Sequence, residues 1–238
     1  MKVRISRNRA LSHIEVVAII ASLSLTLVLV IPALAHDQAR SSRIACANNL
    51  RQIGMGFQIW GNEHNDTLPQ EVALANGGTM QHSLAPNVWF HFAWISNEVF
   101  SPRIYFCPSD SGEPALAFSG SPGSGYLNPN FANRATSYFL GYTASSLLNS
   151  PDAVIAGDRN VSTAGLQQFG GCSRFNSALS IPTPPRAGIA EWTTGLHGAA
   201  GNVLSYDGKV QQLDSGGLRR ALDLPQTDNA TRHIITPR

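Results

Sequence analysis

The longest apolar stretch in the 238-residue chain lies close to its N-terminus. Residues 16–35, VVAIIASLSLTLVLVIPALA, contain no charged side chain. A helix of this length is about 30 Å long, which matches the hydrocarbon thickness of a bilayer. The pattern therefore predicts a membrane-spanning helix. A cleaved secretory signal peptide ending at Ala33-Leu34-Ala35 is the alternative, although the apolar core of such a peptide is usually only about 7–15 residues long.

The helical period continues beyond this stretch. Between residues 37 and 62, apolar side chains recur at spacings of three and four, which predicts one apolar stripe consisting of Ile44, Ala47, Leu50, Ile53, Phe57 and Trp60. Together with the preceding span, the stripe predicts one helix of about 45–50 residues. Pro32 removes one hydrogen bond within it. We expect the helix to end near Gly61-Asn62, because Pro69 follows.

The rest of the chain carries signals for short strands. Residues 136–142, 153–156 and 188–192 are β-prone, and two further β-prone runs flank Asp207-Gly208. An Asp-Gly pair between such runs predicts a hairpin with a type I′ turn. A short helix is expected over residues 218–224, and a long loop over 108–135, where Gly, Pro, Asn and Ser are dense. The fold class is therefore α+β, with a long N-terminal helix and an antiparallel β-sheet.

Charge is distributed unevenly along the chain. Charged residues make up only 13% of the chain, about half of the ~25% typical of soluble domains. The first ten residues carry four basic and no acidic side chains, so the remainder has 13 basic and 15 acidic residues. Basic residues before an apolar span favour a cytoplasmic N-terminus and an external body. No basic run occurs in the body, which argues against nucleic-acid binding.

Few residues suggest chemistry. The three cysteines, Cys46, Cys107 and Cys172, permit at most one intramolecular disulfide, and the absence of a CxxC spacing argues against a zinc site. His197 and Asp207 are a candidate metal-binding or catalytic pair. The favoured interpretation of them is structural, with Asp207-Gly208 forming the turn and His197 bonding a neighbouring loop. No G-x-S-x-G sequence supports a hydrolase triad.

The N-terminal segment resembles the class III signal of type IV pilins and type II secretion pseudopilins. In that family prepilin peptidase cuts before the apolar stretch and methylates the new N-terminus, which here implies cleavage between Ala10 and Leu11. Glu15 is then the fifth mature residue and Pro32 the twenty-second, as in the family. The family prefers Gly before the cut and Phe or Met after it, so this chain departs at both positions. Glu15 is implied to pair with the N-terminal amine of a neighbouring subunit and to set the filament register.

Four later segments extend the resemblance. They are similar to a pseudopilin-like family, common in planctomycetes and verrucomicrobia, that has a prepilin-type N-terminus and a domain of unknown function. The segments are Cys46-Ala-Asn-Asn-Leu-Arg-Gln-Ile-Gly54, Phe106-Cys-Pro-Ser-Asp110, Ala156-Gly-Asp-Arg-Asn160, and His197 with Asp207-Gly208 after nine residues. The resemblance favours a Cys46–Cys107 disulfide, with three free thiols as the alternative. Because some pseudopilins bind calcium, the resemblance also suggests a calcium site formed by Asp158, Asp207 and loop carbonyls.

These observations lead to one organisation of the chain. Residues 1–10 are expected to be a basic leader, 11–36 a transmembrane assembly helix, and 37–238 an extracytoplasmic pilin-like α+β head. The resemblance implies a structural, non-enzymatic subunit of a secretion or pilus-like filament. Its partners would be prepilin peptidase, other pilin or pseudopilin subunits and the inner membrane.

Two other functions remain open from the sequence. The first is a membrane-anchored module that binds a polysaccharide or another secreted substrate, with aromatic side chains as stacking platforms: Trp89, Trp94, Tyr126 and Tyr142. The second is an extracytoplasmic hydrolase that uses His197 and Asp207. Each requires its residues to be exposed or brought together by the fold.

Overall fold

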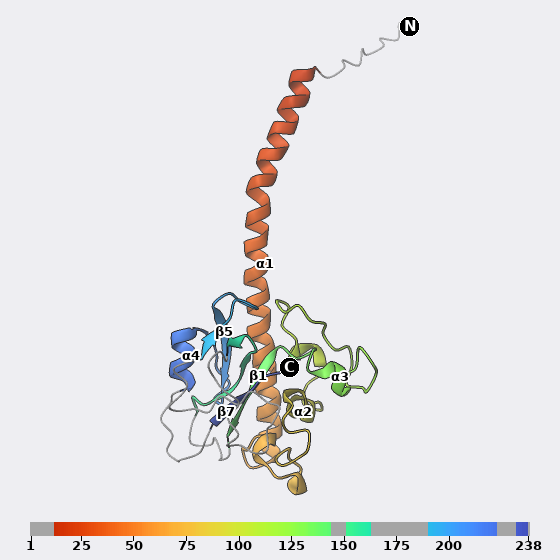
Figure 1. Ribbon diagram of the computed structural model, residues 1–238, viewed down its shortest axis with the longest axis vertical. Coiled ribbons are helices and arrows are strands. Elements are labelled where there is room, and N and C mark those ends of the chain that lie inside the picture. Colours follow the sequence, from red (N-terminus) through yellow and green to blue (C-terminus); the bar gives the residue numbers. More distant parts are fainter. Residues whose placement is uncertain (1–11, 144–150, 163–189, 223–231, 238) are drawn as a thin grey trace, which may run out of the picture. The chain divides into compact units, whose positions relative to one another are not determined.

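The computed structural model describes residues 12–143, 151–162, 190–222 and 232–237. The chain divides into two units, residues 1–41 and residues 42–238. Helix α1 (His13–Glu63) contributes to both units and is 51 residues long, close to the expected 45–50 (Figure 1). It continues without interruption through position 32 and ends two residues after Gly61.

In the first unit, α1 is apolar and exposed. Its residues His13–Ile31 form a helix long and apolar enough to cross a membrane, and none of that segment is buried within the structure. Ser12 and Glu15 close the start of the helix as a capping box. The Ser12 N–H donates to Glu15 Oε2 at 2.8 Å, and the Glu15 N–H donates to Ser12 Oγ at 3.3 Å.

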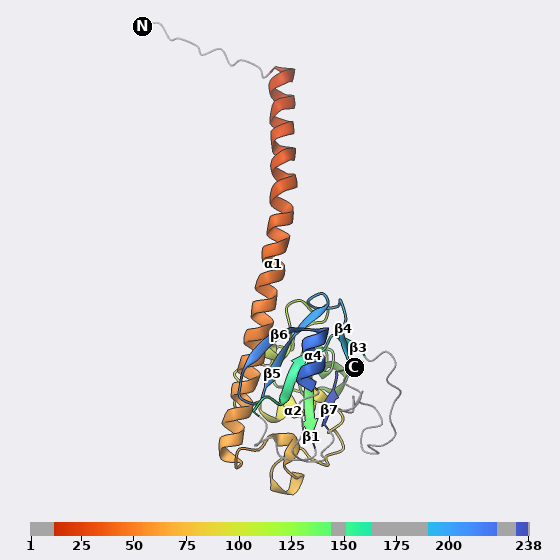
Figure 2. The same ribbon diagram turned by 90° about the vertical axis from the view of Figure 1, so that its left-hand side faces the viewer.

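The second unit is built on an antiparallel sheet of five strands in the order β6-β5-β2-β1-β7 (Figure 2). A separate two-stranded sheet pairs β3 with β4. The expected antiparallel arrangement is therefore present, and β7 and β3 are additions that the sequence did not predict. The strands are β1 (Tyr138–Thr143), β2 (Val154–Asp158), β3 (Val161–Ser162), β4 (Glu191–Trp192), β5 (Ala200–Ser205), β6 (Val210–Asp214) and β7 (Arg232–Ile235).

Both faces of the central sheet carry apolar side chains. Neighbouring residues of a strand point to opposite sides, so consecutive apolar residues contribute to both faces. On β1, Tyr138 and Leu140 belong to a core cluster with the stripe of α1 and with helix α2 (Val88–Trp94). Phe139, between them, belongs to a second cluster with β4 and with helix α4 (Ser215–Leu222). Helical and two-stranded layers thus cover the sheet on its two sides.

The buried stripe of α1 differs slightly from the predicted one. Leu50, Ile53, Phe57 and Trp60 are buried as expected, but Ile44 is 54% exposed and the stripe begins at Cys46. Ile44 is two residues from Cys46, which rotates its side chain by about 200° to the opposite side of the helix.

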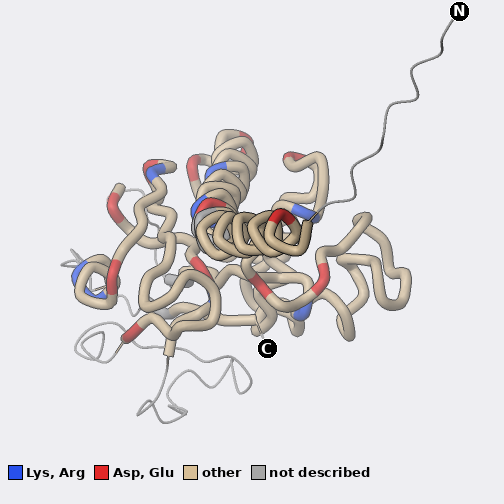
Figure 3. Tube along the Cα trace, turned by 90° about the horizontal axis from the view of Figure 1, so that it is seen from above, with Lys and Arg blue, Asp and Glu red and all other residues tan. Residues whose placement is uncertain are grey.

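Shorter helices connect these elements. Helix α4 starts three residues earlier than predicted, and α2 was not predicted at all. The expected loop at 108–135 consists mainly of turns, with one short helix, α3 (Pro129–Ala132). The described residues also form three 3-10 helices: η1 (Pro69–Glu71), η2 (Leu74–Asn76) and η3 (Pro102–Tyr105). Charged residues of both signs are scattered along the described chain (Figure 3).

Candidate functional site

A buried disulfide links α1 to the segment after η3. Cys46 and Cys107 are joined with an S–S distance of 1.99 Å and a Cα–Cα distance of 5.0 Å, and both are 0% exposed. This is the pair that the family resemblance favoured. Its members are 61 residues apart in sequence, so in the chain-entropy model the closed loop stabilises the fold by about 4 kcal/mol.

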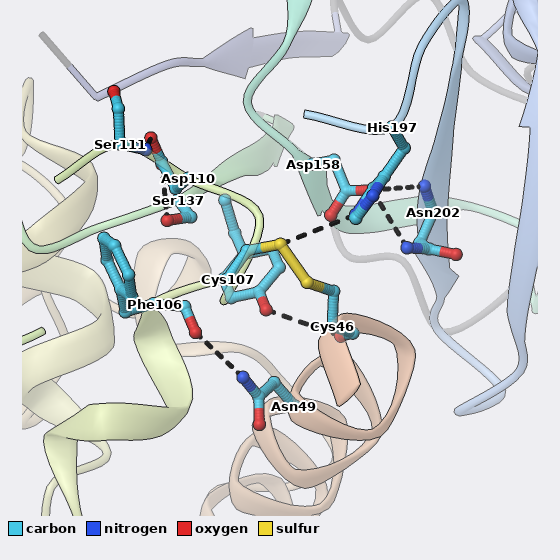
Figure 4. The surroundings of a disulfide bond; sticks show 11 residues. Cys46, Asn49, Phe106, Cys107, Asp110, Ser111, Ser137, Asp158, His197 and Asn202 are labelled. Atoms are coloured by element: carbon cyan, nitrogen blue, oxygen red, sulfur yellow. Dashed lines mark hydrogen bonds and ion pairs between the residues drawn. A yellow bond between two sulfur atoms is a disulfide. The ribbon is translucent and has the colours of Figure 1, made fainter. Parts of the chain in front are cut away.

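Further contacts of the first motif hold α1 against the rest of the head, and the one made by Asn49 is drawn in Figure 4. Asn49 Nδ2 donates to the Phe106 carbonyl at 2.9 Å. Tyr138 Oη, from β1, donates to the Cys46 carbonyl at 3.4 Å. The last residue of the motif, Gly54, allows close packing, because a Cβ there would lie 3.0 Å from Leu204 Cδ1. The motif therefore joins helix and sheet.

Asp110 connects the second motif to the third. Its Oδ1 accepts from Arg159 Nη2 at 2.6 Å and its Oδ2 accepts from Ser137 Oγ at 2.6 Å. The Ser111 N–H also donates to Oδ1, at 2.8 Å. Asp110 has a side chain that is only 3% exposed, while that of Arg159 is 27% exposed. A largely buried carboxylate is thus fully supplied with donors, as burial requires.

Asp158, in the third motif, lies beside His197 of the fourth. Their Oδ2 and Nε2 atoms are 3.5 Å apart, and both side chains are nearly inaccessible to solvent. Asn202 donates to Asp158 Oδ2 twice, from its N–H at 2.6 Å and from Nδ2 at 3.0 Å. His197 Nε2 is also 3.5 Å from Cys107 Sγ. The fourth motif therefore meets both the third motif and the disulfide.

Burial dominates the electrostatics of this pair. Desolvation raises the pKa of Asp158 to about 7, although the two hydrogen bonds from Asn202 oppose the shift. Desolvation lowers the pKa of His197, and the nearby positive charge of Arg43 lowers it further. Both effects favour the neutral forms in the folded state.

The backbone that carries His197 is also fixed. Arg43 Nη2 donates to the His197 carbonyl at 3.1 Å. Asn160, the last residue of the third motif, donates from Nδ2 to the Thr193 carbonyl at 2.9 Å and to the Ala200 carbonyl at 3.2 Å. The loop that carries His197 is therefore hydrogen-bonded to α1 through Arg43 and to the segment after β2 through Asn160, which fits the expected structural role of His197.

Asp207 and Gly208 form the predicted hairpin turn between β5 and β6, but the turn is not of type I′. A type I′ turn needs positive φ at both central residues, and only Gly208 has one, at 83°. The Gly208 N–H donates to the Ser205 carbonyl at 2.9 Å. The loop is therefore a type I turn followed by a left-handed glycine, a conformation that spares Asp207 the strained region.

The fold does not bring Asp207 to the buried pair. Val154, at the start of β2, pairs with Ser205, whereas Asp158 ends that strand about 13 Å away. Asp207 is exposed and its Oδ1 accepts from the Lys209 N–H at 3.0 Å. The proposed calcium pair of Asp158 and Asp207 and the hydrolase pair of His197 and Asp207 are therefore both wrong.

Several other predicted residues lie away from this site. Trp94, for example, is half-buried and donates from Nε1 to the Gly77 carbonyl at 2.8 Å. Trp89 and Tyr126 are buried in the core, at 4% and 0% exposure, so they are not surface platforms for a sugar. Glu15 lies in the capping box already described. The proposed cleavage residues Ala10 and Leu11, and the third cysteine, Cys172, lie outside the described residues.

A separate pocket of about 240 Å³ lies near the end of α1. Phe57, Leu68 and Ile155 supply apolar walls, and its polar lining includes Gln58, Asn62, Asp66 and Tyr206. Tyr206 Oη donates to the Asp66 carbonyl, which ties the hairpin to the loop after α1. Sequence reasoning did not predict this pocket, because its walls come from segments far apart in the chain.

Comparison with protein-family models, curated proteins and solved structures finds no match for this chain.

Proposed function

We propose that the chain is a structural subunit of a type II secretion or type IV pilus-like filament. In this proposal prepilin peptidase removes residues 1–10, α1 anchors the subunit in the inner membrane, and the pilin-like head faces outward. The observation that carries the proposal is the single 51-residue helix, which contains both an exposed apolar segment and a buried stripe. A secretory signal peptide would be removed with that apolar segment, whereas a filament subunit would retain it.

The composition of the N-terminus supports the proposed orientation. Four basic residues precede the helix, and the first acidic residue, Glu15, is at its start. The helix N-terminus carries a partial positive charge, which favours an acidic residue in the first turn. A mature chain that begins at Leu11 would place its amine one residue before the capping box.

The head has the properties of a durable extracytoplasmic domain. Disulfides persist in oxidising compartments, and here one joins α1 to the head core. The four motifs make mostly buried contacts with one another, which supports a structural rather than an enzymatic role. The motifs then serve to fix the head on the helix that assembles.

Intact-mass analysis of the protein from its native membrane tests this function. We expect a chain that begins at a methylated Leu11 in cells with active prepilin peptidase, and a chain that retains residues 1–10 where the peptidase is inactivated. A mature N-terminus near His36 or Asp37 would instead establish a signal peptide and overturn the proposal.

The pocket at the end of α1 favours a second candidate, a membrane-anchored binding module. Aromatic, amide and carboxylate groups in one pocket are suited to a hydroxylated ligand such as a saccharide. Titration with an oligosaccharide library tests this, with Tyr206→Ala as the pocket variant. Binding that Tyr206→Ala weakens would support the module, and filament assembly without any saccharide binding would reject it.

A further inference from the structure

The disulfide is part of a larger buried cluster of potential metal ligands. The two sulfur atoms of Cys46 and Cys107 and a ring nitrogen of His197 all lie within 4.8 Å of one another, and the three residues are buried. In the oxidised form the sulfur atoms are bonded to each other and are not thiolate ligands. Reduction would convert them into the two sulfur donors that structural zinc sites commonly use.

A fourth possible donor, Asp158, lies beside His197. Asp158 Oδ2 is 3.5 Å from His197 Nε2, and the Asp158 side chain is fully buried. Its second oxygen, Oδ1, is buried and has no hydrogen-bond partner in the described part of the chain. A buried carboxylate oxygen without a partner is costly, and coordination of a cation would remove that cost.

We propose that the reduced protein binds one Zn²⁺ ion through Cys46, Cys107, His197 and Asp158. Tetrahedral bonds of about 2.0–2.3 Å place neighbouring ligand atoms roughly 3.3–3.8 Å apart. Nε2 of His197 is already 3.5 Å from Cys107 Sγ and from Asp158 Oδ2, while the other oxygen of that carboxylate, Oδ1, is the one without a hydrogen-bond partner. The two sulfur atoms, now 1.99 Å apart, have to separate by rotation of the cysteine side chains. The Asp158 carboxylate, which lies beside His197 but outside the group of three, also has to move toward the sulfur atoms.

The chemistry is a balanced exchange between two cross-links. A dithiol reductant supplies two electrons and two protons, the S–S bond breaks, two thiols form, and the reductant becomes a disulfide. Zn²⁺ then replaces the two thiol protons and the proton of any Asp158 carboxyl that is protonated, and these protons are released to solvent. Oxidation reverses the sequence and expels the metal. Either cross-link ties α1 to the sheet, so the head is held before and after oxidation.

This site could not be predicted from the sequence, because its ligands come from four separate segments. Zinc sites are recognised in sequences by cysteines and histidines at short spacings. Here the nearest two ligands in the chain, Asp158 and His197, are almost forty residues apart. The proposal does not depend on the filament function, since it concerns only contacts inside the head.

The test uses the full chain in detergent. The protein is reduced with a dithiol, freed of reductant by anaerobic gel filtration, and then exposed to Zn²⁺ or Co²⁺. We expect one Zn²⁺ retained per reduced chain, the release of at least two protons per ion, and a Co²⁺ spectrum with thiolate charge transfer and intense tetrahedral bands. The oxidised chain should retain no metal. Absence of retained metal on the reduced chain would overturn the proposal.

Variants assign the ligands. His197→Ala and Asp158→Asn should each weaken Zn²⁺ binding at least tenfold. Cys107→Ser should reduce the intensity of the thiolate charge-transfer band of the Co²⁺ form by at least half. Cys172→Ser is the matched control, which deletes the third thiol and should leave binding unchanged. Circular dichroism of the oxidised His197→Ala and Asp158→Asn proteins checks that they fold. Undiminished binding in His197→Ala, or equal binding by the urea-unfolded reduced chain, would show that the site is not the one proposed.

Discussion

At the scale of single residues, burial decides what the motif side chains do. His197 was a candidate for catalysis or metal binding and Asp158 a candidate for calcium binding, but in the oxidised head both are shielded from solvent. Asp110 and Asn49 each satisfy a charged or backbone partner from another motif, and Asn160 satisfies backbone carbonyls on either side of His197. A polar side chain placed this way stabilises one arrangement of the chain, because losing a partner leaves a buried group unsatisfied.

Two ion pairs with the same N–O distance differ in how deeply their carboxylates are buried, and this difference predicts different contributions to stability. The pairs Arg159–Asp110 and Arg219–Glu191 both have N–O distances of 2.6 Å, but Asp110 is 3% exposed and Glu191 is 60% exposed. We expect Asp110→Ala to lower the free energy of unfolding by about 3 kcal/mol, since it also leaves buried Ser137 without its acceptor. Glu191→Ala should cost no more than about 1 kcal/mol. Urea denaturation measures both, and equal effects would contradict the burial argument.

The burial of His91 predicts that the stability of the fold depends on pH. Burial lowers its pKa to about 4, partly offset by the hydrogen bond to the Ala85 carbonyl. The unfolded chain therefore takes up the proton first, and the stability that neutral His91 confers is present above pH 6.5 and is lost as the pH falls toward 4.

The change to test is His91→Gln, compared with the wild type at pH 7 and pH 5. Asp158 and His197 titrate in both proteins, so the difference between the two proteins isolates His91. Wild-type stability should fall by about 2 kcal/mol relative to the variant between these pH values. Urea unfolding curves give the difference, and a constant gap would show that His91 does not titrate as expected.

At the scale of elements, the pattern along the chain predicted helix and hairpin positions well, but not the contacts between elements. The sequence locates α1 and the β5–β6 hairpin, because each follows a local period or a turn signal. It misses α2, whose seven residues read VWFHFAW without a polar face. Such a segment is buried on nearly all sides, and apolar runs of this length do not distinguish helix from strand.

Substitution of Gly141 in β1 tests how closely β1 and β2 pack. A Cβ at Gly141 would lie 2.1 Å from the Val154 carbonyl oxygen of β2, and backbone there cannot move without breaking the strand pairing. We expect Gly141→Ala to destabilise the head by about 3 kcal/mol. Gly120→Ala is the matched control, because nothing lies within 4 Å of its Cβ. Thermal unfolding measures both, and two equal melting temperatures would count against the close approach.

At the scale of the whole molecule, the proposed assembly depends on Glu15. In the single chain its carboxylate accepts from the Ser12 N–H as part of the capping box. In the proposed filament it would instead pair with the terminal amine of a neighbouring subunit. These two roles make different demands, because capping needs only an acceptor and pairing needs a negative charge.

Two substitutions at this position separate the roles. Glu15→Gln keeps an acceptor for the cap but loses the charge, and Glu15→Ala loses both. If charge pairing sets the register, both variants should leave the head folded and reduce incorporation into filaments at least tenfold. Normal incorporation of Glu15→Gln, with failure of Glu15→Ala alone, would assign Glu15 to capping. Immunoblotting of sheared filaments against total membrane protein provides the measurement.

The sequence by itself determined the features that depend on neighbours within a few turns of the chain. These are the apolar segment at residues 16–35, the helix through residue 63 and the Asp207-Gly208 hairpin. Only the tertiary structure decided the rest. It shows that Ile44 is exposed, that His197 meets Asp158 rather than Asp207, and that one residue from each of the four motifs lies at the disulfide or beside His197. Contacts such as Arg43 with His197 join residues 154 positions apart, and no local period encodes which distant segments pack together.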